Sequence, residues 1–249
     1  MVRVFTNTGL YIMSELGPHP ANAWRLKDGV MDLSRQQPAP NVVEFHAENY
    51  PVRIDLSRTA LIVIDMQRLF CEPDDGRASR NAIAPLGALL PALREANVPI
   101  IWVNWGNRPD EANLPPGVRY PFNRRRLDAP APFLTAGSTD AQTVPELPAR
   151  AGDIHVDKYR LSGFWDTPLD SILRGRRIDT LLFSGVNLDQ CVYHTLADAH
   201  FLGYDCVLLR DCAATVSPDF CIDATLYNVK GMGFVAESSA LRAALSDGR

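Results

Sequence analysis

The amino-acid sequence predicts an α/β protein with a doubly wound, mostly parallel six-stranded sheet and helices on both faces. From residue 59 onwards, short apolar and often β-branched runs alternate with segments of helical spacing. This alternation is typical of such a sheet. The length of 249 residues suits one large domain of this class, and the 46% of hydrophobic residues allow a sizeable core.

The strands and helices are expected in strict alternation. Thr59–Ile64 (TALIVI) is a continuous apolar run, which indicates a strand buried on both faces of a parallel sheet. Thr167 stands where it can cap a helix that begins at Pro168. Further strands are expected at Val98–Val103, Asp153–Val156, Thr180–Ser184, Cys206–Leu209 and Gly233–Val235, and helices at Ala82–Ala96, Pro168–Gly175, Asp189–Phe201 and Pro218–Val229.

Two stretches depart from this alternation. Residues 1–54 carry scattered proline, asparagine and charge without sustained periodicity. We expect them to form an N-terminal arm with little regular structure, which wraps the core or a neighbouring subunit, while residues 55–249 form a single domain. Inside that domain, residues 105–150 are rich in proline, arginine and aspartate and predict a long surface excursion. Long loops within compact domains are often functional.

Charge and cysteine content exclude several classes of function. A net charge of −4 and an isoelectric point of about 5.7 argue against general attraction to nucleic acid or to an anionic membrane. We see no signal-like N-terminus and no apolar run near the roughly 20 residues that span a bilayer. Five cysteines without a CxxC pair argue against a disulfide framework or a cysteine-based zinc site. A cytoplasmic location fits best.

Cys191 is the first candidate for chemistry. The segment SGVNLDQC leads from the predicted strand that ends at Ser184 into the helix that follows. A cysteine in the first helical turn faces the positive end of the helix dipole, which lowers the thiol pKa. Free backbone N–H groups there can hold an oxyanion. Taken alone, Cys191 is better interpreted as an ordinary buried cysteine.

Asp65 and Lys158 also follow predicted strands, and ligands of such sheets bind beyond the carboxyl ends of the strands. Asp65 ends the first strand and suits a general base, a metal ligand or a helix cap. Lys158 comes just after the third strand and suits either solvated surface or a charge that stabilises nearby anions. The residues after Asp65 are typical of the start of an active-site loop.

The segments that hold these residues resemble the Asp–Lys–Cys motifs of the isochorismatase-like cysteine hydrolases. The matching segments are LIVIDMQ with Asp65, DKYRLSGFWDTPLD with Lys158 and SGVNLDQCV with Cys191. This superfamily includes nicotinamidases, N-carbamoylsarcosine amidase, ureidoacrylate amidohydrolase and biuret hydrolase. The resemblance covers roughly residues 55–240, and three motifs in the same order and spacing are a specific signal.

The resemblance implies a mechanism. Asp65 would take the thiol proton, Cys191 would attack an amide or ureido carbonyl, and Lys158 would support the developing charge. Backbone N–H groups of Cys191 and Asn187 would form the oxyanion hole. Water would then hydrolyse the thioester. Members of the superfamily carry a cis peptide at the position that corresponds to the bond between Val186 and Asn187.

Departures from the family patterns refine the expectation. Many members have threonine where Leu188 stands. Nicotinamidases carry metal ligands on and after the second strand, but residues 104–108 read NWGNR and no histidine lies between His46 and His155. We therefore expect no metal and no cofactor. True isochorismatases lack the cysteine, so Cys191 favours C–N hydrolysis over vinyl ether hydrolysis.

Within the superfamily, residues 159–170 most resemble the ureidoacrylate and biuret amidohydrolase branch. The expected substrate is therefore a small ureido, carbamoyl or carboxamide compound. Residues expected either to contact it or to pack in the core are Phe70, Asn104, Trp105, Asn107, Tyr159, Phe164, Trp165 and Gln190. The run Arg124–Arg126 could meet a substrate carboxylate, but a solvated or subunit-contact role is favoured.

Two other functions stay open at this point. One is a non-catalytic binding or regulatory protein of the same fold, and the other is a hydrolase of an ester or an enol ether. The resemblance also implies a homodimer or homotetramer, with the N-terminal arm and residues 105–150 as contact regions.

Overall fold

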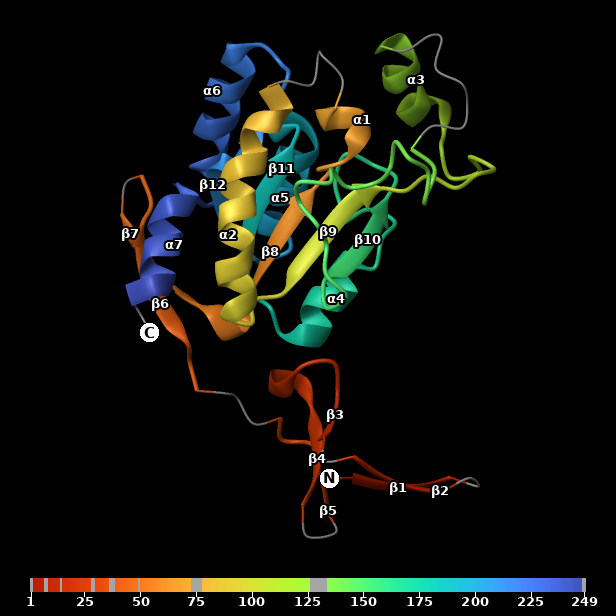
Figure 1. Cartoon of the computed structure of the whole chain (residues 1–249), viewed down its shortest axis with the longest axis vertical. Coiled ribbons are helices and arrows are strands. Elements are labelled where there is room, and N and C mark those ends of the chain that lie inside the picture. The colour runs from red at the N-terminus through yellow and green to blue at the C-terminus, as the bar shows by residue number, and fades with distance from the viewer. Residues whose placement is uncertain are drawn as a thin grey trace.

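The computed structural model describes residues 2–6, 9–13, 15–27, 30–35, 39–48, 50–72, 78–125 and 134–247. Figure 1 shows a central sheet flanked by helices, with an N-terminal segment that extends from this body.

The central sheet has six parallel strands in the order β10-β9-β8-β11-β12-β13. From β8 the chain adds β9 and β10 on one side, and it then returns to add β11, β12 and β13 on the other side. This makes the sheet doubly wound. This confirms the predicted fold class. The strands are β8 (Thr59–Ile64), β9 (Ile100–Trp105), β10 (Ile154–Lys158), β11 (Thr180–Val186), β12 (Asp205–Ala214) and β13 (Phe234–Ala236).

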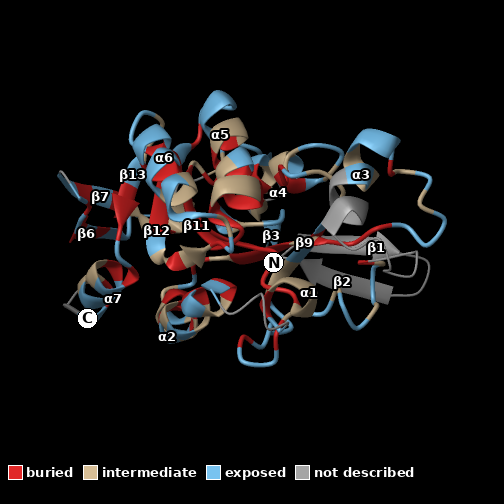
Figure 2. Cartoon of the chain, turned by 90° about the horizontal axis from the view of Figure 1, so that it is seen from above, coloured by how far each residue is buried: buried red, intermediate tan, exposed pale blue. Residues whose placement is uncertain are grey.

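Helices cover both faces of this sheet, and Figure 2 shows the buried strands between the two helical layers. Apolar side chains of α2 (Ile83–Glu95) and α7 (Ser238–Asp247) pack into one core cluster. A second cluster takes in side chains of α4 (Leu169–Arg176), α5 (Tyr193–Phe201) and α6 (Asp219–Val229). The central strands β8 and β11 therefore need residues that can be buried on both faces, as in the wholly buried TALIVI of β8.

Several element boundaries differ from the sequence prediction. β10 continues to Lys158, two residues past the expected end at Val156. The helix expected at Asp189–Phe201 consists of a π-helical turn η5 (Leu188–Val192) followed by α5. The helix α7 was not predicted. It forms because Leu241 and Leu245, one turn apart, are both buried.

The N-terminal arm contains more regular structure than predicted. Its strands form antiparallel pairs between β1 and β2, between β3 and β4, between β4 and β5, and between β6 and β7. The expectation of little regular structure is therefore wrong for this segment. The strands are β1 (Val2–Thr6), β2 (Gly9–Met13), β3 (Glu15–Leu16), β4 (Trp24–Lys27), β5 (Val30–Asp32), β6 (Val42–His46) and β7 (Pro51–Asp55).

The hairpin of β6 and β7 belongs to the core of the domain. Val43, Phe45, Val52 and Ile54 alternate with exposed residues and are buried in the same cluster as α2 and α7. This period-two pattern is the signal of a half-buried hairpin. The domain therefore begins near residue 42 and not at residue 55.

In its described part, residues 106–125 and 134–153, the excursion between β9 and β10 holds one short helix, α3 (Pro116–Arg125), and turns. It is not wholly a surface loop, because Leu134, Val144 and Leu147 are buried. Isolated bridges join Gln67 to Thr143 and Asn107 to Thr135. The part from residue 134 onwards is thus held against the carboxyl end of the sheet.

We predict that Phe45→Ala lowers the free energy of unfolding by about 3–5 kcal/mol, because it removes a large buried side chain. Val42→Ala, on the exposed face of the same strand, serves as the matched control and should change it by less than about 0.5 kcal/mol. Urea denaturation measures both values. Equal, small effects would show that the hairpin does not belong to the core.

Candidate active site

The carboxyl ends of three strands place the candidate residues at one edge of the sheet. Asp65 directly follows β8, Lys158 is the last residue of β10, and Cys191 lies in the η5 turn after β11. Asp65 has a φ of 52°, so the chain turns sharply there, and Gln67 N donates to Asp65 O over 2.7 Å. Aspartate tolerates this left-handed conformation better than most residues.

The approach of β11 to β8 depends on Gly185. This residue has a φ of 115°, and a Cβ atom there would lie 2.0 Å from the Ile64 carbonyl oxygen. Only glycine therefore allows this approach. The next peptide bond, between Val186 and Asn187, is cis, which confirms the expected cis peptide.

The structure brings Asp65, Lys158 and Cys191 into one buried group, called here the Asp–Lys–Cys cluster. Lys158 Nζ lies 2.9 Å from Asp65 Oδ2 and donates to Cys191 Sγ over 3.2 Å. All three side chains are almost inaccessible, with exposed fractions of 1%, 0% and 5%. A buried ammonium group is tolerated only where it is paired and hydrogen-bonded.

Two further contacts hold the Lys158 ammonium group. It donates to the Arg160 carbonyl oxygen over 3.1 Å, and it lies 3.9 Å from the centre of the Trp105 ring. The face of an indole ring attracts a cation, most strongly where water is excluded. The ammonium group therefore contacts a carboxylate, a thiol, a carbonyl oxygen and an aromatic ring.

Burial dominates the acid–base properties of the cluster. It raises the pKa of Asp65 above its usual value, although Lys158 opposes this shift. Burial, followed by the charge of Asp65, raises the pKa of the Cys191 thiol to about 12, and Lys158 opposes this too. The expectation that the helix start lowers the thiol pKa is therefore wrong. The thiol is enclosed and faces a carboxylate, so both effects favour its protonated form.

Thr195 connects the Cys191 turn with the segment after Lys158. Its buried hydroxyl donates to the Cys191 carbonyl oxygen over 2.6 Å and accepts the Gly163 N–H over 3.0 Å. The distance between the two segments is therefore controlled by a single side chain.

Gln67 is a site residue that the sequence analysis did not single out. Its side-chain Nε2 donates to the carbonyl oxygens of Trp105 and Ala141, each over 2.8 Å. Its Oε1 accepts the Trp105 N–H over 3.0 Å, and Asp65 Oδ1 accepts the same N–H over 3.2 Å. Gln67 thereby fixes the backbone that carries the indole ring beneath Lys158. A polar residue two positions after a strand-end aspartate does not by itself predict these hydrogen bonds.

The predicted substrate contacts fall into two groups. Trp105 contacts Lys158, Tyr159 follows it in the chain and is half-buried, and Phe70 is half-buried against the apolar core. Gln190 Nε2 donates to Ser217 Oγ over 3.5 Å. Trp105 thus contacts the Asp–Lys–Cys cluster through its ring, and Phe70 packs against the core cluster that includes Cys191.

The remaining predicted contacts lie elsewhere. Asn104 Nδ2 donates to Thr143 Oγ1 over 3.4 Å, on the face of β9 opposite to Trp105. The Phe164 ring stacks on Tyr204 with centroids 5.9 Å apart, at the amino end of β12. Trp165 is 63% exposed. These side chains are turned away because they pack on other elements or meet solvent.

Asn107 has a structural role in the loop. It is buried, its backbone N–H donates to the Leu134 carbonyl oxygen over 2.8 Å, and its carbonyl oxygen accepts the Ala136 N–H over 3.0 Å. In the run Arg124–Arg126, Arg126 and the side chains of the other two lie outside the described residues.

Comparison with known proteins identifies the family of this chain. The model of the isochorismatase domain matches residues 59–240. The chain belongs to the isochorismatase family. Its matched part begins with β8 and ends within α7, so it contains all six strands of the sheet and the whole Asp–Lys–Cys cluster.

Solved structures of the family are similar to this chain. A cysteine hydrolase from Pseudomonas syringae pv. phaseolicola 1448A is 27% identical with a TM-score of 0.67, covering 79% of this chain and 96% of the other. An isochorismatase family protein from Desulfovibrio vulgaris subsp. vulgaris str. Hildenborough is 26% identical (TM-score 0.66; 76% and 98%). N-carbamoylsarcosine amidase from Thermoplasma acidophilum is 27% identical (TM-score 0.58; 73% and 96%).

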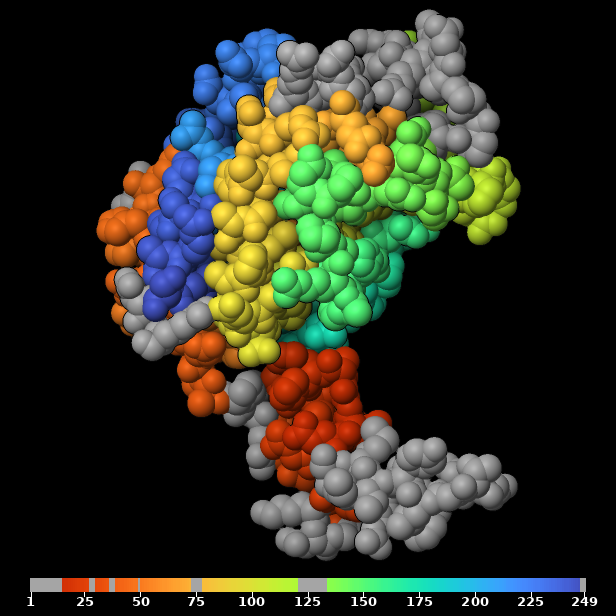
Figure 3. All heavy atoms as spheres, viewed as in Figure 1, coloured from red at the N-terminus to blue at the C-terminus, as the bar shows by residue number. Residues whose placement is uncertain are grey.

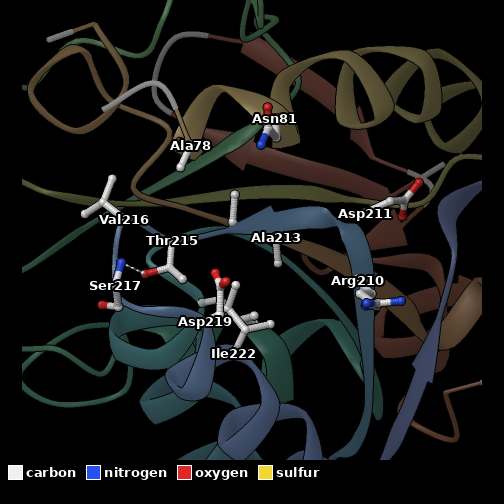
Figure 4. Close-up of a pocket in the computed structure, with 12 residues that line it drawn as sticks. Ala78, Asn81, Arg210, Asp211, Ala213, Thr215, Val216, Ser217, Asp219 and Ile222 are labelled. Atoms are coloured by element: carbon white, nitrogen blue, oxygen red, sulfur yellow. Dashed lines mark hydrogen bonds between the residues drawn. The ribbon is translucent and has the colours of Figure 1, made fainter. Parts of the chain in front are cut away.

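A cavity of about 410 Å³ lies on the other side of β11 from Lys158. In Figure 4, Ala78 and Asn81 of η4 (Ala78–Ala82) face Thr215 and Asp219 across it. Its described lining does not include the Asp–Lys–Cys cluster. It does include Leu188, which belongs to the same η5 turn as Cys191.

The described residues contain no group of three or more histidine, cysteine, aspartate or glutamate side chains arranged to hold a metal ion. Among these residues there is also no helix of sufficient length and hydrophobicity to cross a membrane.

We predict that Gln67→Met leaves the buried Trp105 and Ala141 carbonyl oxygens without their donor, at a cost of about 1–3 kcal/mol each in unfolding free energy. Gln142→Met, at an exposed position in the neighbouring loop, is the control and should be nearly neutral. Chemical denaturation compares the two variants. A neutral Gln67→Met would contradict the positioning role.

Proposed function

We propose that the chain is a cysteine amidohydrolase that cleaves the C–N bond of a small carboxamide, carbamoyl or ureido compound. The observation that carries this proposal is the enclosed Asp–Lys–Cys cluster, in which Lys158 Nζ lies within 3.2 Å of a thiol and 2.9 Å of a carboxylate. A nucleophile, a base and a fixed positive charge in one dry site are the parts that acyl transfer needs.

The raised pKa values of Cys191 and Asp65 support this proposal. At rest Cys191 is a protonated thiol, because burial and Asp65 both raise its pKa. Asp65 is a stronger base than an ordinary aspartate, because burial raises its pKa as well. Asp65 therefore takes the proton as the sulfur attacks, and no preformed thiolate is required.

The remaining steps follow from the positions of the groups. Sulfur attack on the substrate carbonyl forms a tetrahedral oxyanion, which we assign to the backbone N–H groups of Cys191 and Asn187. The Lys158 charge stabilises the negative charge that moves between sulfur and carboxylate. Asp65 returns its proton to the leaving amine or ammonia, which leaves an acyl or carbamoyl thioester. Water then cleaves this thioester and restores the thiol.

Two observations support C–N hydrolysis over hydrolysis of an enol ether. The nucleophile is present and is held by the two other members of the cluster. The similar N-carbamoylsarcosine amidase carries, by its name, an activity on a carbamoyl compound. On the sequence of residues 159–170 we extend the proposal to the ureidoacrylate and biuret branch and to ureido substrates.

The proposal also covers the location, the oligomeric state and the partners of the enzyme. All five cysteines are free, which fits a reducing cytoplasm. A homodimer or homotetramer is proposed, with the N-terminal arm as one contact region because it extends from the body of the domain (Figure 3). Neither nucleic acid nor membrane is expected as a partner.

We predict that Cys191→Ala lowers kcat/KM for amide hydrolysis by more than about 1,000-fold while the protein stays folded. Cys221→Ala, at a half-exposed position on α6, is the matched control and should keep full activity. Ammonia release is measured over a panel of carboxamides, ureides and carbamoyl compounds, with esters and an enol ether as competing substrates. Undiminished hydrolysis by Cys191→Ala would overturn the proposal, as would turnover of esters or enol ethers alone. A wild-type protein inactive on the whole panel would favour the binding-protein alternative.

We also predict the direction of the pH dependence. Asp65 must be ionised to accept the thiol proton, so kcat/KM falls as pH drops through its pKa. Because burial raises this pKa, the acid limb of the profile lies above the usual aspartate value of about 3.9. Asp65→Asn should lower the rate by about 100- to 10,000-fold and abolish the limb. An acid limb that persists unchanged in Asp65→Asn would assign it to another group.

A further inference from the structure

A second cavity, of about 580 Å³, lies at the opposite end of the sheet from the Asp–Lys–Cys cluster. It is lined by residues that precede β8, β11 and β12, among them Arg58, Asp179 and Tyr204. Residues of the N-terminal arm, Asn22 and Arg35, complete it. Its volume is within the range of small-molecule sites, about 300–1,000 Å³. We call it the arginine hollow.

Four arginines from three parts of the chain line the arginine hollow, against a single carboxylate in its described lining, Asp179. They are Arg35, Arg58, Arg174 and Arg177. The chain as a whole carries a net charge of −4, so this concentration of positive charge runs against the overall balance. Like charges held together raise the local potential and attract anions.

Two of these arginines already have carboxylate partners. Arg58 pairs with Asp179, and Arg174 Nε lies 2.8 Å from Asp170 Oδ2. The Tyr204 hydroxyl also donates to Asp170 over 2.8 Å, and the Arg174 guanidinium lies 5.9 Å from the Tyr204 ring centre. These contacts orient the two guanidinium groups at the wall of the hollow.

The other two arginines have no carboxylate partner among the described residues. Arg35 donates only to neutral acceptors, Asn22 Oδ1 over 2.8 Å and the Leu33 carbonyl oxygen over 3.2 Å. The half-buried side chain of Arg177 makes no hydrogen bond or ion pair in the described part of the chain. The hollow therefore holds two guanidinium groups whose charge is not neutralised.

From this arrangement we infer that the arginine hollow binds a small polyvalent oxyanion, such as a phosphorylated or polycarboxylate metabolite. Guanidinium groups donate in a planar fork that matches phosphate and carboxylate oxygens. An anion with several charged oxygens can meet Arg35 and Arg177 together, and a monovalent anion can neutralise only one of them.

An anion bound in the arginine hollow would also link the N-terminal arm to the domain. Asn22 Nδ2 donates to the Gly175 carbonyl oxygen over 2.7 Å, which docks the arm at the end of α4. Arg35 belongs to the arm and Arg177 to the domain, so an anion between them adds a second link. The site does not depend on the proposed hydrolase activity, because it lies at the other edge of the sheet.

The test is isothermal titration calorimetry of the full-length chain with pyrophosphate, orthophosphate and citrate, each at the same ionic strength. We expect pyrophosphate or citrate to bind more tightly than orthophosphate. Arg35→Gln and Arg177→Gln should each weaken this binding by about tenfold or more. Arg53→Gln is the matched control, because Arg53 is an exposed arginine paired with Glu44 outside the hollow. It should bind like the wild type.

The outcomes separate the ligand classes and the failure of the inference. A preference for pyrophosphate indicates a phosphorylated ligand and a preference for citrate a polycarboxylate, and both support the site. Arg177→Lys keeps the charge without the planar fork and should bind with intermediate affinity, which guards against loss of folding in the glutamine variant. No binding of any probe, or equal binding by the wild type, Arg35→Gln and Arg177→Gln, would overturn the inference.

Discussion

The buried ammonium group of Lys158 is the interaction on which the candidate site depends. Its exposed fraction is 0%, and it touches a carboxylate, a thiol, a carbonyl oxygen and an indole ring. A lone buried charge costs several kcal/mol, and these partners offset that cost. The same enclosure raises the pKa of both acidic partners. The enclosure of the cluster therefore governs both the contacts of Lys158 and the acidity of Asp65 and Cys191.

The order of the strands explains how such a cluster can form. Lys158 ends the edge strand β10, Asp65 follows β8, and β9 lies between them. The lysine side chain therefore extends over the end of β9, where it meets the Trp105 ring. Gln67 and Asp65 both accept the Trp105 N–H and so hold this ring from below. Strand β9 thus carries the ring that supports the Lys158 ammonium group.

The two edges of the sheet have different chemical characters. The carboxyl edge holds a buried ion pair and a buried thiol, and the loop from residue 134 onwards is bridged to this edge. The amino edge is open and holds the arginine hollow, which includes two residues of the N-terminal arm.

The sequence alone determined the doubly wound sheet and the three residues of the cluster. Continuous apolar runs that alternate with helical segments indicate strands with both faces buried, and parallel strands place their following residues at one edge. The positions of Asp65, Lys158 and Cys191 follow from this rule because each is tied to a strand end. The cis peptide before Asn187 came from family resemblance and is present.

Only the tertiary structure decided which other side chains reach that edge and how acidic the thiol is. Asn104 and Phe164 looked like pocket residues, but the face of the strand and the packing on Tyr204 turn them away. Gln67 carries no sequence signal for its three hydrogen bonds, because its acceptors and donor come from residues far along the chain. The raised pKa of Cys191 depends on enclosure and on the nearby carboxylate, and neither can be read from a helix start.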